Sequence, residues 1–192
     1  MKKKIIFLNG PPGSGKDLTA SFMVNGHGFK SFAFATPLVE ITEALFPMYF
    51  YEDFKRNCQV VPNKSGRDFI IDLAESFIKP YLGKDFFALN LVDRIIMEND
   101  VLSKENGIVI TDLGFQEELD VVIPKLRSFF EKEDIDSCFE IWHITRKGHT
   151  YSNDSRNYLW DERVNKIRVL TNDGSFSDLE KQVSSSTFSI EE

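Results

Sequence analysis

The stretch GPPGSGKD, at residues 10–17, has the residue types and spacing that bind a phosphate group. It matches the pattern G-x-x-x-x-G-K and stands between an apolar run at residues 5–8 and a helix-forming stretch. Gly13 and Gly15 allow positive φ angles and bring no Cβ, so backbone N–H groups can turn inward around an anion. Lys16 adds a positive charge for the β- and γ-phosphate oxygens, and the following helix adds its N-terminal dipole. We therefore expect a phosphate-binding loop; the alternative is an ordinary glycine-rich turn. The expected contact residues are Gly10, Gly13, Ser14, Gly15, Lys16, Asp17 and Leu18.

Two aspartates are candidates for organising a metal ion. Asp17 stands where a phosphate loop usually has the Ser or Thr that coordinates Mg²⁺; its carboxylate can bind the ion directly or hold a metal-bound water. Asp112 ends the apolar run 107–111, and is a candidate for a ligand of a Mg²⁺-bound water or for a contact with the phosphate acceptor. Each has a simpler alternative: Asp17 as a favourable charge in the first helical turn, and Asp112 as a cap of the next helix.

The arginines gather in one segment. Four of the eight lie, together with Lys147, near or between the last two expected strands: Arg146, Arg156, Arg163 and Arg168. Phosphoryl transfer spreads negative charge over the transferred oxygens, and the planar guanidinium group binds such oxygens bidentately. We therefore predict that this segment closes over a phosphate as a lid. A solvated loop of mixed charge is the alternative, because Asp154, Asp161 and Glu162 are interleaved.

Strands and helices are expected to alternate along the chain. The apolar runs predict strands at residues 5–8, 29–34, 107–112, 137–145 and 166–171. The helical patterns cover residues 17–24, 36–46, 67–83, 84–99, 117–132 and 177–183, with Pro124 marking a kink or a second helix start. This alternation predicts a parallel, doubly wound sheet with helices on both faces, and the first strand at its centre.

Local signals place the helices between residues 36 and 83. Thr36 and Pro37 have the types expected of an N-cap and a first helical residue. Phe69, Leu73 and Phe77 are spaced to form one buried face of a helix that should end near residue 80. Residues 47–66 have no clear period and are expected to be a long connection with, at most, a short helix.

The composition limits the classes of partner. A length of 192 residues suits one domain, and a net charge of -7 disfavours nonspecific binding to DNA or to an anionic membrane. The first apolar run is too short for an export signal, and no run approaches the roughly 18 residues of a membrane span. Cys58 and Cys138 favour a reduced, soluble, cytoplasmic protein over a disulfide-bonded one. The three histidines lack metal-ligand spacing, and His143 is expected to be a core or edge residue.

The residues SGKD followed by LTA resemble the phosphate loop of phage-type deoxynucleoside monophosphate kinases. Three further stretches are similar to parts of that family: FAFATPLVEITEAL, IVITDLGFQEELD, and the pair HITRKGHTYSNDS and VLTNDGSFSDL. The resemblance implies a three-layer α/β/α P-loop NTPase fold with a mostly parallel five-stranded sheet, formed by one domain over residues 1–192. Within it, a helical acceptor-binding part is expected at about 36–100, a small lid at about 146–165, and a frayed tail at 184–192.

The resemblance also implies an activity and roles for residues. It implies transfer of a phosphoryl group from ATP, with Mg²⁺, to a deoxynucleoside monophosphate, with Lys16, Arg146 and Arg156 as catalytic residues. It further implies that the turn of Asn172, Asp173 and Gly174 contacts the adenine through its backbone. The chain departs from the family where an acceptor-binding arginine is expected, because residue 114 is Gly114. Arg67 is the remaining candidate for holding the acceptor, although a solvated charge at a helix start is the alternative.

Two other functions stay open at the level of the sequence. Gly114 leaves room for a kinase of another small or modified-nucleotide acceptor, or for a nucleotide-binding protein without transferase activity. Small-molecule nucleotides are the expected partners, neither a membrane nor DNA is expected to be bound, and a homodimer remains an option. If the chain is encoded by a phage, the expected location is the host cytoplasm.

Overall fold

The computed structural model describes residues 3–57, 64–98, 105–133, 137–152 and 154–188. Its centre is a five-stranded sheet of β1 (Lys3–Asn9), β2 (Phe29–Phe32), β3 (Gly107–Leu113), β4 (Ser137–Thr145) and β5 (Lys166–Thr171). The strand order is β2-β3-β1-β4-β5, and every pair is parallel. The predicted five-stranded parallel sheet with the first strand at its centre is therefore confirmed.

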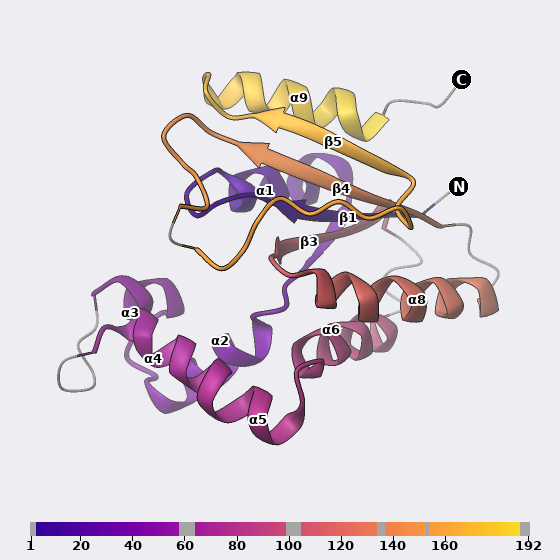
Figure 1. Cartoon of the computed structure of the whole chain (residues 1–192). Coiled ribbons are helices and arrows are strands. Elements are labelled where there is room, and N and C mark those ends of the chain that lie inside the picture. Colours follow the sequence, from indigo (N-terminus) through magenta and orange to yellow (C-terminus); the bar gives the residue numbers. More distant parts are fainter. Residues whose placement is uncertain (1–2, 58–63, 99–104, 134–136, 153, 189–192) are drawn as a thin grey trace.

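Helices cover both faces of the sheet, which gives three layers (Figure 1). Alternate side chains of β1 point to opposite faces. Ile5 and Phe7 lie in one core with α6 (Phe86–Met97) and α8 (Gln116–Lys132). Ile6 and Leu8 lie in the other core with α1 (Lys16–His27) and α9 (Phe176–Phe188). The continuous apolar run of β1 is thus explained by burial on both faces.

A separate group of helices lies to one side of the sheet layers, between β2 and β3 in the chain (Figure 1). Its elements are α2 (Thr36–Leu45), α3 (Tyr51–Asn57), α4 (Gly66–Asp72), the π-helical stretch η1 (Leu73–Ile78) and α5 (Lys79–Leu82). The ring of Phe54 is fully buried and lies 4.8 Å from that of Phe46 and 5.8 Å from that of Phe69, measured between centroids. Aromatic packing therefore holds this group together.

The helix expected over residues 67–83 differs from the prediction in two ways. It is divided into α4, η1 and α5 and ends at Gly83, with Pro80 in the first turn of α5. Its buried apolar side chains are those of Ile70, Ala74 and Ile78, whereas Phe77 is 60% exposed. The sequence contains two adjacent apolar stripes at the same spacing, so its pattern cannot tell which stripe faces the neighbouring helices.

Two helix boundaries also differ from the expectations, and Pro124 does not start a second helix. The N-cap of α2 is Ala35 rather than Thr36, whose hydroxyl instead donates to the Ala33 carbonyl oxygen at 2.8 Å. Helix α8 continues through Pro124 without a second start. Helix α9 extends to Phe188, so the tail expected to be frayed from residue 184 is helical up to there, and residues 189–192 lie outside the described part.

The described residues also bear on the membrane and cysteine predictions. None of the helices in these ranges is long and apolar enough to cross a membrane. Cys138 lies buried in β4, and Cys58 lies outside the described residues.

Replacing Gly66 by alanine should destabilise the protein. Helix propensity alone favours alanine by at most about 1 kcal/mol. A Cβ on Gly66 would, however, overlap the carbonyl group of Phe54 in α3, which is backbone and cannot turn away. We expect overpacking to prevail, with a net loss of about 2 kcal/mol and a fall in Tm of roughly 6 °C, measured by thermal unfolding.

Gly26→Ala in α1 is the matched control, because no atom lies within 4 Å of a Cβ at that position. There the propensity gain acts alone and should stabilise the protein by about 0.5–1 kcal/mol. Equal Tm changes for the two variants would contradict the close contact between α3 and α4.

Candidate active site

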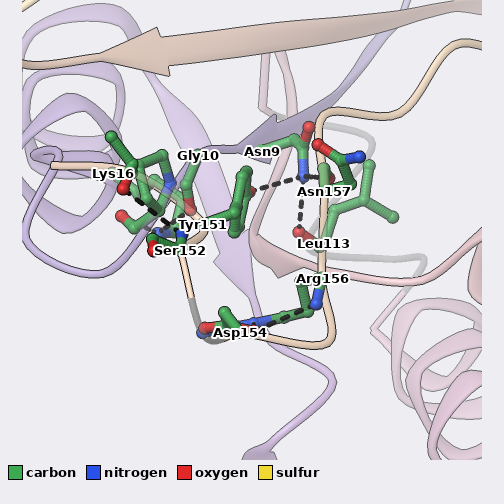
Figure 2. A network of polar contacts seen from close by, with 11 residues as sticks. Asn9, Gly10, Lys16, Leu113, Tyr151, Ser152, Asp154, Arg156 and Asn157 are labelled. Carbon is green, nitrogen blue, oxygen red and sulfur yellow. Dashed lines mark hydrogen bonds and ion pairs between the residues drawn. The ribbon is translucent and has the colours of Figure 1, made fainter.

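The glycine-rich loop joins the end of β1 to the start of α1, as predicted. Gly13 and Gly15 have φ angles of 77° and 106°, which a residue with a Cβ rarely adopts. The Lys16 ammonium group folds back over the loop and donates to the carbonyl oxygens of Gly10 at 2.6 Å and Pro11 at 3.1 Å (Figure 2). The loop thus has the shape of a phosphate cradle, with its lysine at the centre.

Segments distant in the sequence form the walls of this loop. Arg146 donates to the Gly13 carbonyl oxygen at 3.2 Å, and Asn172 Nδ2 donates to that of Ser14 at 2.9 Å. The His149 ring lies so close to Gly13 that a Cβ there would be 2.6 Å from its Cδ2 atom. The expected lid and the expected base-contacting turn therefore both reach the phosphate loop.

Two observations fit an anion in the loop. The Ser14 side chain is fully buried, and its hydroxyl has no hydrogen-bond partner among the described residues. A buried polar group without a partner is costly, and a bound phosphate oxygen would supply one. The pKa of Lys16 is lowered mainly by burial and next by the positive charge of Arg156. Two cations share one small region, so a bound anion would stabilise both charges.

Arg156 extends from the lid segment over the peptide backbone that follows β3. Its Nε and Nη2 atoms donate to Asp154 at 2.8 and 2.6 Å, and these hydrogen bonds are the main reason that the pKa of Asp154 is held at about 2 (Figure 2). A Cβ on Gly114 would lie 2.6 Å from Arg156 Cδ. The absence of a side chain at residue 114 is what makes room for Arg156.

The Asn9 amide, fully buried at the end of β1, connects the lid segment to the sheet (Figure 2). Its Nδ2 lies 3.1 Å from the Leu113 carbonyl oxygen, 3.1 Å from the Tyr151 hydroxyl and 3.2 Å from the Asn157 carbonyl oxygen. Its Oδ1 accepts from the Leu159 N–H at 3.0 Å. One side chain therefore fixes Tyr151, Asn157 and Leu159 relative to β1 and β3.

His143 supports the same segment from β4. Its Nε2 lies 2.9 Å from the Leu159 carbonyl oxygen, and its ring packs against those of Tyr158 and Trp160, with both centroid distances 5.0 Å. Burial lowers the pKa of this imidazole. The expectation that His143 is a core or edge residue agrees with its 3% exposure.

The two aspartates occupy different environments. Both carboxylate oxygens of Asp112 accept backbone N–H groups, from Phe34 at 2.8 Å and from Ala35 at 2.9 Å, and burial raises its pKa. It thus binds the backbone just before α2 and does not cap the next helix, α8, at whose start Glu118 accepts the backbone N–H groups instead. Asp17 is exposed in the first turn of α1. No group of three or more His, Cys, Asp or Glu side chains suited to a metal occurs within the described ranges.

Arg67 lies in the first turn of α4, whose start is fixed by reciprocal hydrogen bonds between Ser65 and Asp68. Among the described residues it forms no hydrogen bond or ion pair. Its charge nevertheless contributes to lowering the pKa of Asp154, after the larger effect of Arg156. An exposed cation with no partner in the described part of the chain therefore lies near the lid.

The four arginines that the sequence groups together do not act as one cluster. Arg146 and Arg156 lie at the phosphate loop. Arg163, by contrast, pairs with Asp161 and, at 2.5 Å, with Asp120 of α8, and Arg168 pairs at 2.9 Å with Glu140 of β4. For those two, the predicted role in the lid is not supported, because Arg163 is held by Asp161 of its own segment and by Asp120 of α8, and Arg168 lies in β5.

The turn after β5 is held between the lid and the loop. Asp173 Oδ1 accepts the Lys147 N–H at 2.6 Å, and the Asn172 N–H donates to the Thr145 carbonyl oxygen at 2.8 Å. Of the three residues named from the resemblance, Asn172 contacts the glycine-rich loop, Asp173 binds the lid segment, and Gly174 lies against Asp178. Whether they contact an adenine stays a prediction.

Sequence reasoning missed three residues of this site: Asn9, Tyr151 and His149. Only Asn9 had a usable signal, since a polar residue directly after a buried strand and before a phosphate loop is at the edge where ligands bind. Tyr151 and His149 belong to a segment without regular structure, and nothing in its spacing indicates which side chains face inward.

Known structures include proteins with a similar fold. An unliganded sugar kinase from Janibacter sp. HTCC2649 superposes with a TM-score of 0.52 and 10% identity, over 99% of this chain and 96% of that one. The dephospho-CoA kinase from Campylobacter jejuni gives a TM-score of 0.45 and 14% identity, over 97% and 96%. The first likeness shows the α/β fold and nothing about substrate. No family model matches the chain, and neither does any curated protein sequence.

Replacing Asn9 by aspartate should weaken the attachment of the lid segment. The variant keeps the shape but directs a carboxylate oxygen, instead of N–H donors, at the oxygens of Leu113, Tyr151 and Asn157. We expect a loss of about 3 kcal/mol at neutral pH, seen as a fall in Tm of roughly 9 °C. Part of that loss should be recovered at about pH 5, because a buried carboxyl group binds a proton more readily in the folded state.

Asn157→Asp is the control for this experiment, since that side chain is exposed and binds only the N–H of Tyr158. Its Tm should change little. An Asn9→Asp variant as stable as the Asn157→Asp variant would contradict the role assigned to the Asn9 amide.

Proposed function

We propose that the chain transfers the γ-phosphoryl group of ATP to a nucleoside or deoxynucleoside monophosphate and releases the diphosphate. The observation that carries this proposal is the convergence of cationic side chains from separate parts of the sequence on one glycine-rich loop. Lys16 belongs to the loop, Arg146 and Arg156 come from the lid segment, and Arg156 influences the charge state of Lys16. Such a group of cations suits a reaction whose transition state spreads negative charge over phosphoryl oxygens.

The donor triphosphate would bind in the loop. Backbone N–H groups and the Ser14 hydroxyl would bind its oxygens, and Lys16 would leave the carbonyl oxygens of Gly10 and Pro11 to reach it. The turn of Asn172, Asp173 and Gly174 would contact the base through backbone groups, since it lies directly against the loop.

Mg²⁺ bound with ATP would supply further neutralisation of phosphate charge. Asp17 and Asp112 are the candidates for holding it, and one or two carboxylates together with phosphate oxygens are the usual ligands of this ion. Asp17 is the better placed of the two, because both oxygens of Asp112 already accept backbone hydrogen bonds.

The acceptor would lie between the helical group and the loop. Arg67 is close enough to the lid to influence the pKa of Asp154 and has no hydrogen bond or ion pair among the described residues, so its guanidinium group is available for a phosphate. Arg156 would act from the opposite side, after exchanging Asp154 for phosphoryl oxygens. We assign the helical group at about 36–100 to acceptor binding and the segment at about 146–165 to the lid.

A kinase of another small acceptor is the second candidate function. It is favoured by Gly114, where the resembling family is expected to have a phosphate-binding arginine, and where the Arg156 side chain instead fills the space. The two candidates share every step at the donor site and differ only in the acceptor.

The first experiment is transfer from Mg·ATP to each common nucleoside and deoxynucleoside monophosphate, followed by the formation of ADP and diphosphate. Lys16→Ala should lower kcat/KM on the order of 10²–10³-fold, because it removes a charge that binds the transferring oxygens. Lys125→Ala, which removes an exposed lysine of α8, is the matched control and should leave the rate unchanged.

Diphosphate formed from at least one monophosphate, and lost in Lys16→Ala, would support the proposed function. ATP binding without transfer to any acceptor in the panel would reject it in favour of a different acceptor or a protein that only binds nucleotides.

The contact between Gly114 and Arg156 generates a second prediction. Gly114 does not have a positive φ, so alanine is acceptable to the backbone and its methyl group would displace only the Arg156 side chain. Gly114→Ala should therefore lower kcat/KM by about 10- to 100-fold, through misplacement of Arg156. Combined with Arg156→Ala, the two losses should not add, because they act on the same guanidinium group. Losses that multiply in the double variant would show that Gly114 acts independently of Arg156.

A further inference from the structure

A cavity of 410 Å³ is lined by residues of α5, α6 and the first turn of α8. Figure 1 shows how these three helices are arranged. Its walls include Phe87 and Ala88 of α6, Lys79 and Pro80 of α5, and Phe115 and Glu118 at the start of α8. Its size is in the range of small-molecule sites, and its walls combine the side chains of Phe87 and Phe115 with several charged residues.

Glu118 has one carboxylate oxygen engaged and one available. Its Oε2 atom accepts the N–H groups of both Gly114, at 2.8 Å, and Phe115, at 3.0 Å. Its Oε1 atom forms no hydrogen bond or ion pair with the described residues. Because the other oxygen is fixed by two backbone donors, the orientation of Oε1 is determined before any ligand binds.

The cavity and the candidate active site meet at the dipeptide Gly114–Phe115. The N–H groups of Gly114 and Phe115 bind Glu118, which lines the cavity. The side chain of Arg156 packs against Gly114, in the space that a Cβ would occupy. A molecule with a phosphate at Arg156 could therefore extend its other end past Gly114 into the cavity.

We infer that this cavity binds the base of the acceptor nucleotide, and that Glu118 Oε1 accepts a hydrogen bond from an exocyclic amino group of that base. The inference rests on the proposed function and makes it more specific. It predicts acceptors with an amino group, such as cytosine or adenine nucleotides, in preference to those with a carbonyl group at the same position. A carbonyl oxygen facing Glu118 would meet another acceptor and leave both without a hydrogen.

The charges around the cavity favour a base over a phosphate. Glu75, Asp85, Glu117 and Glu118 line it, against Lys79 and Lys84, and Lys79 is paired with Glu75 at 2.5 Å. Lys79 Nζ also lies 5.3 Å from the centre of the Phe115 ring. A phosphate group would meet net negative charge here, whereas a flat base with an amino group would find an aromatic wall and an acceptor.

The protonation state of Glu118 determines the pH at which this inference has to be tested. Burial is the main cause that raises the pKa of this carboxyl group to about 7, and the negative charge of Asp112 raises it further. The N–H groups of Gly114 and Phe115 and the charge of Lys79 oppose this rise. Assays at about pH 8 keep Glu118 ionised, so that Oε1 is purely an acceptor.

The test compares acceptors that differ only in this group: dCMP with dUMP, and dAMP with dIMP. For at least one pair, kcat/KM of the unmodified protein should be about 10-fold or more higher for the amino member. Glu118→Gln keeps an oxygen for the backbone donors and turns an NH₂ group toward the cavity, so the preference should disappear or reverse. Glu131→Gln, an exposed glutamate near the end of α8 that does not line the cavity, is the matched control and should keep the original ratio.

Binding of deoxycytidine and deoxyuridine, measured by calorimetry, separates this inference from the proposed function, because it requires no transfer. Phosphorylation of monophosphates with the same amino-to-carbonyl ratio in Glu118→Gln would overturn the inference and leave the kinase intact. Absence of transfer, together with deoxycytidine binding that is lost in Glu118→Gln, would reject the kinase and retain the base site. Thermal unfolding of each variant confirms that the compared proteins are folded.

Discussion

Asn9 stands where three parts of the molecule meet: the end of the central strand, the end of β3 and the segment that carries Arg156. Its side chain is buried, and its amide nitrogen and oxygen are both used, which is how a buried amide avoids a desolvation cost. The described residues between Arg146 and Lys166 form no helix or strand, so this segment depends on contacts with the rest of the protein for its shape. The hydrogen bonds of Asn9 replace regular structure in that role, and the arrangement of the candidate site depends on them.

The charges of the site are balanced within the protein itself. Arg156 is bound to Asp154, and Lys16 is bound to the carbonyl oxygens of its own loop. A phosphate could replace these contacts. It carries more negative charge than the Asp154 carboxylate or a neutral carbonyl oxygen, so each cation would gain a stronger partner. The protein thereby avoids leaving buried cations without partners and keeps them where a phosphate would bind.

Close backbone approaches explain two glycines that have no special φ angle. Gly66 lets α4 pack directly on the carbonyl group of Phe54, and Gly114 lets Arg156 cross the backbone after β3. In each case the missing Cβ sets the position of an arginine: Arg67 follows Gly66, and Arg156 lies on Gly114. Gly114 is the position where the sequence departs from the family it resembles, and the structure gives that departure a steric reason.

The sequence by itself determined the elements whose pattern is local. The apolar runs gave all five strands, and the spacing of Gly13, Gly15 and Lys16 gave the loop, because burial on both faces and positive φ angles each leave a direct mark on residue type. Other features depended on partners distant in the chain. Arg156 and Arg163 look alike in sequence, yet one lies over Gly114 and the other pairs with Asp120 of α8. The role of Asn9, the buried stripe of α4 and η1, and the free oxygen of Glu118 were likewise decided only by tertiary packing, because each depends on which groups the fold brings within hydrogen-bonding or van der Waals distance.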